Sequence, residues 1–148
     1  MGYLIYFLAS GAFVGFTPVA PGTAGSLLGV GLFLLIFPEG TVGTLTYLAL
    51  AVPAAVWLAG QAEVAFGETD PKPVVVDEVV GQWIALALLP RTALYVGAAF
   101  VLFRIFDIWK PWRGLEELRG GVGVVADDLA AGLAANLCLQ ALRLATGA

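Results

Sequence analysis

The amino-acid sequence predicts an all-α fold, a polytopic membrane helical bundle of about six helical segments, some short or only partly spanning, in one domain over 1–148. Of the 148 residues, 60% are hydrophobic and 12% are charged, whereas soluble domains carry about 25% charged residues. Residues 1–38 and 40–62 contain no Asp, Glu, Lys or Arg, and each stretch exceeds the ~20 apolar residues that cross a bilayer. These runs lack the alternation of a β-barrel, so helices must satisfy their backbone groups.

The first half of the chain contains three expected helices. The first covers 3–16 and is uniformly apolar. The second covers 25–37 and ends before Pro38, because proline cannot continue a helix. The third covers 41–66 and carries Pro53, where a kink is expected.

The second half contains three more expected helices. The fourth covers 77–90 and is closed by Pro90, the fifth covers 92–109 and stops before Pro111, and the last covers 125–146. The fourth has only 12 uncharged residues, about 18 Å at 1.5 Å per residue. We expect it to cross the membrane only partly, or to begin above it.

The charges predict which side of the membrane carries the site. Ten of the 11 acidic residues fall within 63–78 and 107–128. If the helices alternate in direction, the loops at 17–25, 66–76 and 110–124 share one side. The basic residues on that side are Lys72, Lys110, Arg113 and Arg119. The positive-inside rule makes this side cytoplasmic.

Two pairs of adjacent acids stand where expected helices begin. Asp77 and Glu78 open the fourth helix, and Asp127 and Asp128 open the sixth. Acids at a helix N-terminus can simply stabilise the helix dipole. A single carboxylate would suffice for that, and adjacent carboxylates repel each other, so the doubled acids favour a metal.

Asp107 lies near the end of the fifth helix, where the dipole disfavours an anion. An ion pair with Arg104 or Lys110, each three residues away, is the structural alternative. Because Asp107 shares its expected side with both acid pairs, we include it among the candidate site residues.

The type of metal follows from the available ligands. The chain has no histidine and one cysteine, which makes zinc and copper sites improbable and leaves carboxylate oxygens, the donors that suit Mg²⁺ or Mn²⁺. Magnesium with few carboxylates commonly serves phosphoryl chemistry. The expected metal ligands are Asp77, Glu78, Asp127 and Asp128.

Basic and small polar residues supply candidate phosphate contacts. Lys110, Arg104 and Arg113 could hold phosphate oxygens, although anchoring to anionic headgroups is an alternative for such residues. Thr23 and Ser26 lie in a small-residue loop at the start of a helix, a place that can bind an anion. An ordinary interhelical turn is the simpler interpretation of that loop, and the ending of a P-loop is missing.

Four sequence blocks together resemble the phosphatidylglycerophosphatase A family of bacterial membrane lipid phosphatases. The blocks are GFTPVAPGTAGSLLG at 15–29, DPKPVVVDEVVGQWIAL at 70–86, FRIFDIWKPW at 103–112 and GGVGVVADDLAAG at 120–132. They follow the family's order and spacing. Two departures are visible, since Arg113 stands where the family usually has proline and Val125 where it often has methionine.

The resemblance implies Mg²⁺-dependent removal of the terminal phosphate from phosphatidylglycerophosphate, giving phosphatidylglycerol. It also implies a lipid substrate and a site at the cytoplasmic face of the bacterial inner membrane. The family's acidic motifs map to all five acids, with Lys110 in the basic position of the third block. The expected catalytic residues are Asp107, Asp128 and Glu78. Asp107 either joins the metal shell or acts as a general base, and a covalent aspartyl-phosphate route stays open.

Other classes of protein fit the sequence less well. A carboxylate-lined cation transporter or channel is the main alternative, but it predicts acids near mid-membrane rather than at one edge. A histidine-dependent lipid phosphatase is excluded by the composition, and the pattern of CDP-alcohol phosphotransferases is not found. The net charge of −4 argues against nucleic acid as a partner. The oligomeric state is not predicted.

Overall fold

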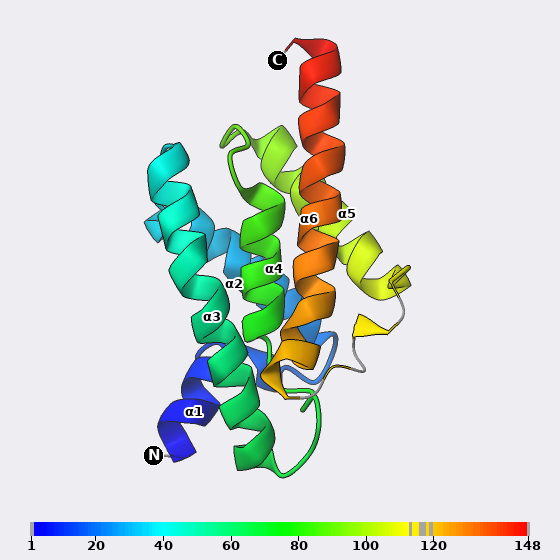
Figure 1. Cartoon of the computed structure of the whole chain (residues 1–148). Coiled ribbons are helices and arrows are strands. Elements are labelled where there is room, and N and C mark those ends of the chain that lie inside the picture. Colours follow the sequence, from blue (N-terminus) through cyan, green and yellow to red (C-terminus); the bar gives the residue numbers. More distant parts are fainter. Residues whose placement is uncertain (1, 113, 116–117, 119, 148) are drawn as a thin grey trace.

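A computed structural model describes residues 2–112, 114–115, 118 and 120–147. Across these residues the protein is all-helical, with six α-helices, one short 3₁₀ helix and no strand (Figure 1), which confirms the predicted fold class. The elements in chain order are α1 (Gly2–Ala9), η1 (Val14–Phe16), α2 (Pro21–Ile36), α3 (Thr41–Phe66), α4 (Val76–Leu86), α5 (Ala93–Trp109) and α6 (Gly121–Thr146).

Helix α4 is the centre of the bundle and contacts α2, α3, α5 and α6. Most of its residues are buried, and Trp83 donates an indole hydrogen bond to the Gly29 carbonyl of α2 at 2.9 Å. The Trp83 ring also packs against Phe37 and Tyr47.

A helix that is enclosed by protein on all sides can be short, and α4 has 11 residues, which confirms the expectation of a short fourth helix. It ends at Leu86 instead of the predicted 90, because Ala87 leaves the helical conformation and Leu88 adopts a positive φ angle.

Helices α4 and α6 approach each other so closely that only glycine fits at the contact. A Cβ atom on Gly132 would lie 2.2 Å from the Gly81 carbonyl oxygen, and one on Gly81 would lie 2.7 Å from the Asp128 carbonyl oxygen. Real Cβ atoms do not come so near to backbone. Small residues at helix contacts are typical of membrane bundles, and here they let two backbones touch.

The first helix ends earlier than the sequence predicts. We expected a helix over 3–16, but α1 stops at Ala9, because Gly11, Ala12 and Phe13 all adopt positive φ angles. The hydroxyl of Ser10 donates to the Tyr6 carbonyl at 2.6 Å and accepts the Phe13 N–H at 3.1 Å, which favours the turn.

The shortened α1 lies against the C-terminal end of α3 and does not cross the bundle (Figure 1). The Tyr6 hydroxyl donates to the Ala65 carbonyl at 2.5 Å, and the Tyr6 and Phe66 rings meet edge to face at 4.6 Å. The expectation that some segments span only partly therefore holds for this one.

Two other helices begin four residues before their expected starts. Helix α2 starts at Pro21 instead of 25, since proline is favoured in the first turn. Helix α6 starts at Gly121 instead of 125, because its first glycine packs on α3, where a Cβ would lie 1.9 Å from the Val56 carbonyl oxygen. The third helix has its predicted bounds.

The outside of the bundle is apolar. Among the described residues, α3 and α6 are long and apolar enough to cross a membrane, and α2 is a shorter apolar helix. Large apolar side chains such as Leu35, Val42 and Leu144 are more than three-quarters exposed. Lipid is the medium in which such a surface is stable, so the surface fits a membrane protein.

The α4–α6 contact predicts a large difference between two glycine substitutions. Gly132→Ala should destabilise the protein by about 1–3 kcal/mol, because its methyl group overlaps backbone. Gly97→Ala, at a helical site on α5 with open space around it, should be neutral or stabilising by about 0.5–1 kcal/mol. Thermal unfolding in detergent measures both. Equal midpoints for the two variants would contradict the close contact.

Candidate active site

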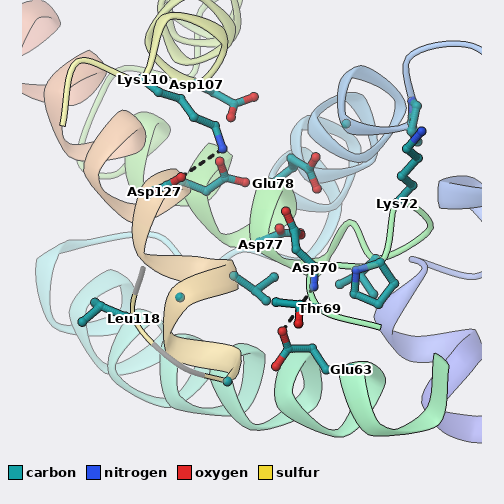
Figure 2. A pocket seen from close by; sticks show the side chains of 18 residues that line it. Glu63, Thr69, Asp70, Lys72, Asp77, Glu78, Asp107, Lys110, Leu118 and Asp127 are labelled. Carbon is teal, nitrogen blue, oxygen red and sulfur yellow. Dashed lines mark hydrogen bonds and ion pairs between the residues drawn. The ribbon is translucent and has the colours of Figure 1, made fainter. Parts of the chain in front are cut away.

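A cavity of about 290 Å³ opens at one end of the bundle (Figure 2), and we call it the acid cavity. Its walls come from the first turn of α2, the α3–α4 connection, the start of α4, the end of α5 and the first turns of α6. The three loops that were expected to share a side therefore converge. The α2–α3 and α4–α5 connections lie at the opposite end (Figure 1). They carry Glu39 and Arg91, whose Oε1 and Nη1 atoms are 3.7 Å apart.

Three acids form the centre of the cavity, and we call them the carboxylate cluster. Asp77, Glu78 and Asp128 each offer an oxygen, and these oxygens all lie within 4.8 Å of one another. Asp77 and Asp128 are buried, and Glu78 is partly buried. Like charges at this separation repel strongly away from water, so the arrangement needs compensation by a cation or by protons.

The positions of the acids on their helices test the capping alternative. Asp77 and Glu78 lie in the first turn of α4, where the dipole favours them, yet no side chain caps this helix. Asp128 lies in the third turn of α6, because that helix starts at Gly121. Dipole stabilisation fades within the first turn. Capping therefore does not account for the acids of α6.

Two oxygens of the cluster have no hydrogen-bond donor among the described residues. They are Asp77 Oδ1 and Glu78 Oε2, and both are buried. A buried carboxylate oxygen without a partner is costly. Oxygen atoms grouped in this way are the donors that Mg²⁺ and Mn²⁺ prefer. The cluster thus fits a hard divalent cation in donor type and in the number of carboxylates.

Asp107 and Arg104 form an ion pair on α5, so the structural alternative for Asp107 is present. The Arg104 Nη1 group donates to Asp107 Oδ2. Asp107 is nevertheless buried and lines the acid cavity next to the cluster. The pairing keeps a carboxylate at the cavity wall.

Lys110 pairs with the fourth acid of the predicted metal set. Its Nζ donates to Asp127 Oδ2 at 2.9 Å (Figure 2). Lys110 caps the end of α5 in a left-handed conformation, and its N–H donates to the Phe106 carbonyl at 2.9 Å. Three of the four predicted metal ligands therefore lie together in the carboxylate cluster. The fourth, Asp127, points at the Lys110 ammonium instead.

The acids around Lys110 alter its acid–base behaviour. Burial lowers the pKa of Lys110, but the hydrogen bond to Asp127 and the charges of Asp127, Asp107 and Asp128 more than offset this and raise the pKa above its ordinary value. The ammonium therefore stays charged throughout the physiological pH range. A fixed positive charge at the cavity is available to a phosphate.

The remaining predicted residues are distributed unevenly. Thr23 lines a groove between α2 and α5, and Ser26 is buried and donates to the Gly22 carbonyl at 2.8 Å. Neither lines the acid cavity, whereas Pro21 and Gly22 of the same block do. The predicted phosphate contact Arg113, like Arg119, lies outside the described residues.

Four polar side chains of the cavity were not among the candidate site residues of the sequence, namely Glu63, Thr69, Asp70 and Lys72. Glu63 Oε1 accepts the Asp70 N–H at 3.2 Å, which ties the end of α3 to the loop before α4. The sequence could have indicated them, since all four lie in or beside the loop at 66–76, which was expected on the same side as the acid pairs.

A family model described as Phosphatidylglycerophosphatase A matches residues 7–143. The chain belongs to this family. Phosphatidylglycerophosphatase A of Escherichia coli is 37% identical over 86% of this chain and 77% of the relative. The Haemophilus influenzae protein of the same name is 36% identical over 94% and 88%. The resemblance seen in the four sequence blocks is therefore confirmed.

A third relative carries a different name. A Bacteroides thetaiotaomicron protein, named provisionally as a phosphatidylinositol-3-phosphatase, is 43% identical over 98% of this chain and 97% of its own length. No solved structure gives a significant match. Membership of the family makes the protein a phosphatase and favours an enzyme over the alternative of a cation transporter.

The pairing with Asp127 predicts how Lys110 reacts with amine reagents. In Asp127→Asn the pKa of Lys110 should fall, because a carboxylate that stabilises the ammonium is gone, so the neutral amine should form at lower pH. Reductive methylation across pH 8–11, followed by mass spectrometry, should show Lys110 modified at lower pH in the variant than in the wild type. Lys72, the other lysine of the chain, calibrates the reagent. Identical pH profiles for Lys110 would contradict the pairing.

Proposed function

We propose that this protein hydrolyses the terminal phosphate of phosphatidylglycerophosphate, with Mg²⁺ or Mn²⁺, at the cytoplasmic face of the bacterial inner membrane. The observation that carries the proposal is the carboxylate cluster, with two buried oxygens that no described residue satisfies. Family membership supports the reaction and the lipid. The acyl tails would stay among lipids while the headgroup enters the acid cavity.

The need for a cation follows from electrostatics. A phosphomonoester carries up to two negative charges, and an acidic cavity repels it unless a cation intervenes. Asp77, Glu78 and Asp128 would hold the ion. When bound, Mg²⁺ neutralises phosphate charge and lowers the pKa of a water molecule.

The other charged residues of the cavity have separate roles in this proposal. Lys110, held in place by Asp127, would contact phosphate oxygens. Asp107, paired with Arg104, would accept the proton of the attacking water. Both residues lie at the cavity wall beside the cluster. Their ion pairs would keep each side chain oriented before the substrate arrives.

The distribution of basic residues supports the cytoplasmic orientation. Lys72, Arg104 and Lys110 lie at or beside the acid cavity, and Arg113 and Arg119 belong to the connection that forms part of its wall. The opposite end holds Arg91 and Arg143. By the positive-inside rule, the more basic end is expected on the cytoplasmic side, which supports this part of the proposal.

A second substrate is worth testing because of the Bacteroides relative. The name of that relative indicates phosphatidylinositol 3-phosphate as a substrate. This lipid has the same order of chemical groups as phosphatidylglycerophosphate. Each lipid has a phosphomonoester on a polyol, and a phosphodiester joins that polyol to diacylglycerol. A site that recognises those two groups could accept either lipid.

The central test is phosphate release by the purified protein from phosphatidylglycerophosphate in detergent micelles, with phosphatidylinositol 3-phosphate in parallel. Release should require Mg²⁺ or Mn²⁺ and stop with a chelator. Asp128→Asn should lower the rate by roughly 100-fold or more, because the cluster loses a charge. Glu39→Gln, which removes an acid at the far end, should retain wild-type activity. No release from either lipid with any divalent ion would refute the proposal.

Orientation is tested with introduced cysteines in a Cys138→Ser background. Glu68→Cys lies in the exposed turn after α3, at the acid end, and Thr41→Cys is exposed at the opposite end of that helix. A membrane-impermeant maleimide should label Thr41→Cys in spheroplasts and Glu68→Cys only after lysis. The reverse pattern would place the acid cavity outside the cytoplasm. Labelling of both in detergent confirms that each thiol can react.

A further inference from the structure

A second hollow, of about 670 Å³, lies between the first turn of α2 and the outer face of α5, and we call it the α5 groove. Its lining residues are Thr23, Phe100, Val101, Arg104, Ile105, Ile108 and Trp109. The apolar members repeat at helical spacing, and Val101, Ile105 and Ile108 are each more than half exposed. From Phe100 to Trp109 the stripe runs about 14 Å along the helix. The groove thus opens to the lipid side of the bundle.

Arg104 joins this groove to the acid cavity. Its side chain lines the groove, while its guanidinium pairs with Asp107, which lines the cavity. On the neighbouring helix, a Cβ on Gly22 would lie 3.3 Å from both terminal nitrogens of Arg104 and 2.4 Å from Glu78 Oε1. Gly22 therefore leaves free the small space that the guanidinium shares with the carboxylate cluster.

The guanidinium is incompletely satisfied by the protein. Arginine has five N–H donors, and the structure pairs its Nη1 with Asp107. The Nε atom is buried and has no acceptor among the described residues. A cation with unused donors, at the junction of an apolar groove and a polar cavity, is complementary to an anion that is attached to a hydrocarbon chain.

We propose that the α5 groove binds an acyl chain of the lipid substrate and that Arg104, with Thr23, binds the phosphodiester. The proposal rests on the proposed function and adds where the rest of the lipid lies. Hydrocarbon, phosphodiester, polyol and phosphomonoester follow one another along the lipid. The groove, Arg104, the space beside Gly22 and the carboxylate cluster follow one another in the same order along the protein. The lipid enters sideways between α2 and α5.

The groove is tested by filling it. Ile105→Trp should lower kcat/KM for dioleoyl phosphatidylglycerophosphate by about tenfold or more. It should leave turnover of the deacylated, water-soluble headgroup unchanged. Leu50→Trp is the matched control, because Leu50 is exposed on α3, on the other side of the bundle (Figure 1). A wild-type rate for Ile105→Trp on the dioleoyl lipid, or equal losses on both substrates, would overturn the acyl-chain site.

Arg104 is tested by comparing substrates with and without a phosphodiester. Arg104→Gln should lower kcat/KM for the lipid and for its deacylated headgroup, and Arg104→Lys should recover part of the loss. Glycerol 3-phosphate has the monoester alone, so its turnover reports only the effect on Asp107, the partner of Arg104. It should fall several-fold less than turnover of the two diester substrates. If Arg104→Gln reduces all three substrates equally, the residue acts on the acid cavity through Asp107 and diester recognition is refuted.

A binding measurement separates this inference from the proposed function. Phosphatidylglycerol with a diazirine in one acyl chain, photolysed with the protein in micelles, should label residues 100–109 of α5. Ile105→Trp should suppress that labelling, and Leu50→Trp should not. Equal labelling of the outer faces of α3 and α5, or no effect of Ile105→Trp, would overturn the groove. Wild-type protein that labels as expected but releases no phosphate from any lipid would instead refute the proposed function.

Discussion

The backbone contact between α4 and α6 is the constraint on which the site depends. Gly81 allows the Asp128 carbonyl of α6 to approach α4, and Gly132 allows the reverse approach one turn further along. The same contact brings the Asp128 carboxylate to the two acids that begin α4. A separation of the two helices by the width of a methyl group would separate the oxygens of the cluster. Helix packing and site geometry are therefore a single property of this bundle.

Charge within the acid cavity is divided into a paired set and an unpaired set. Asp107 has Arg104, and Asp127 has Lys110. For the carboxylate cluster the described residues provide no ion pair. The paired acids hold two cations at the wall, and the unpaired acids leave oxygens free at the centre. If all five acids formed one cluster, Arg104 and Lys110 would lose their carboxylate partners. The three-acid site for a divalent cation would also lose its definition.

Sequence patterns predict a helix end best when residues next to that end in the chain determine it, and less well when packing against another helix determines it. The bounds of α3 were predicted correctly, since a glycine flanks each end, Gly40 before the helix and Gly67 after it. The start of α6 was missed, because its glycines are typical of a loop and become helical only when they pack on α3. The acids were found from their positions beside apolar runs. Asp127 was not distinguished from Asp128, because adjacent residues point about 100° apart on a helix and only the surrounding helices assign each direction.

The early end of α1 has a consequence for the whole chain. Because α1 stays at the acid end, the five longer helices among the described residues run from that end to the other, back again, and finish with α6 pointing away from it (Figure 1). An odd number of passes separates the two termini by the thickness of the bundle. A reporter fused after α6 would therefore sample the compartment opposite the one that a reporter fused before α1 would sample.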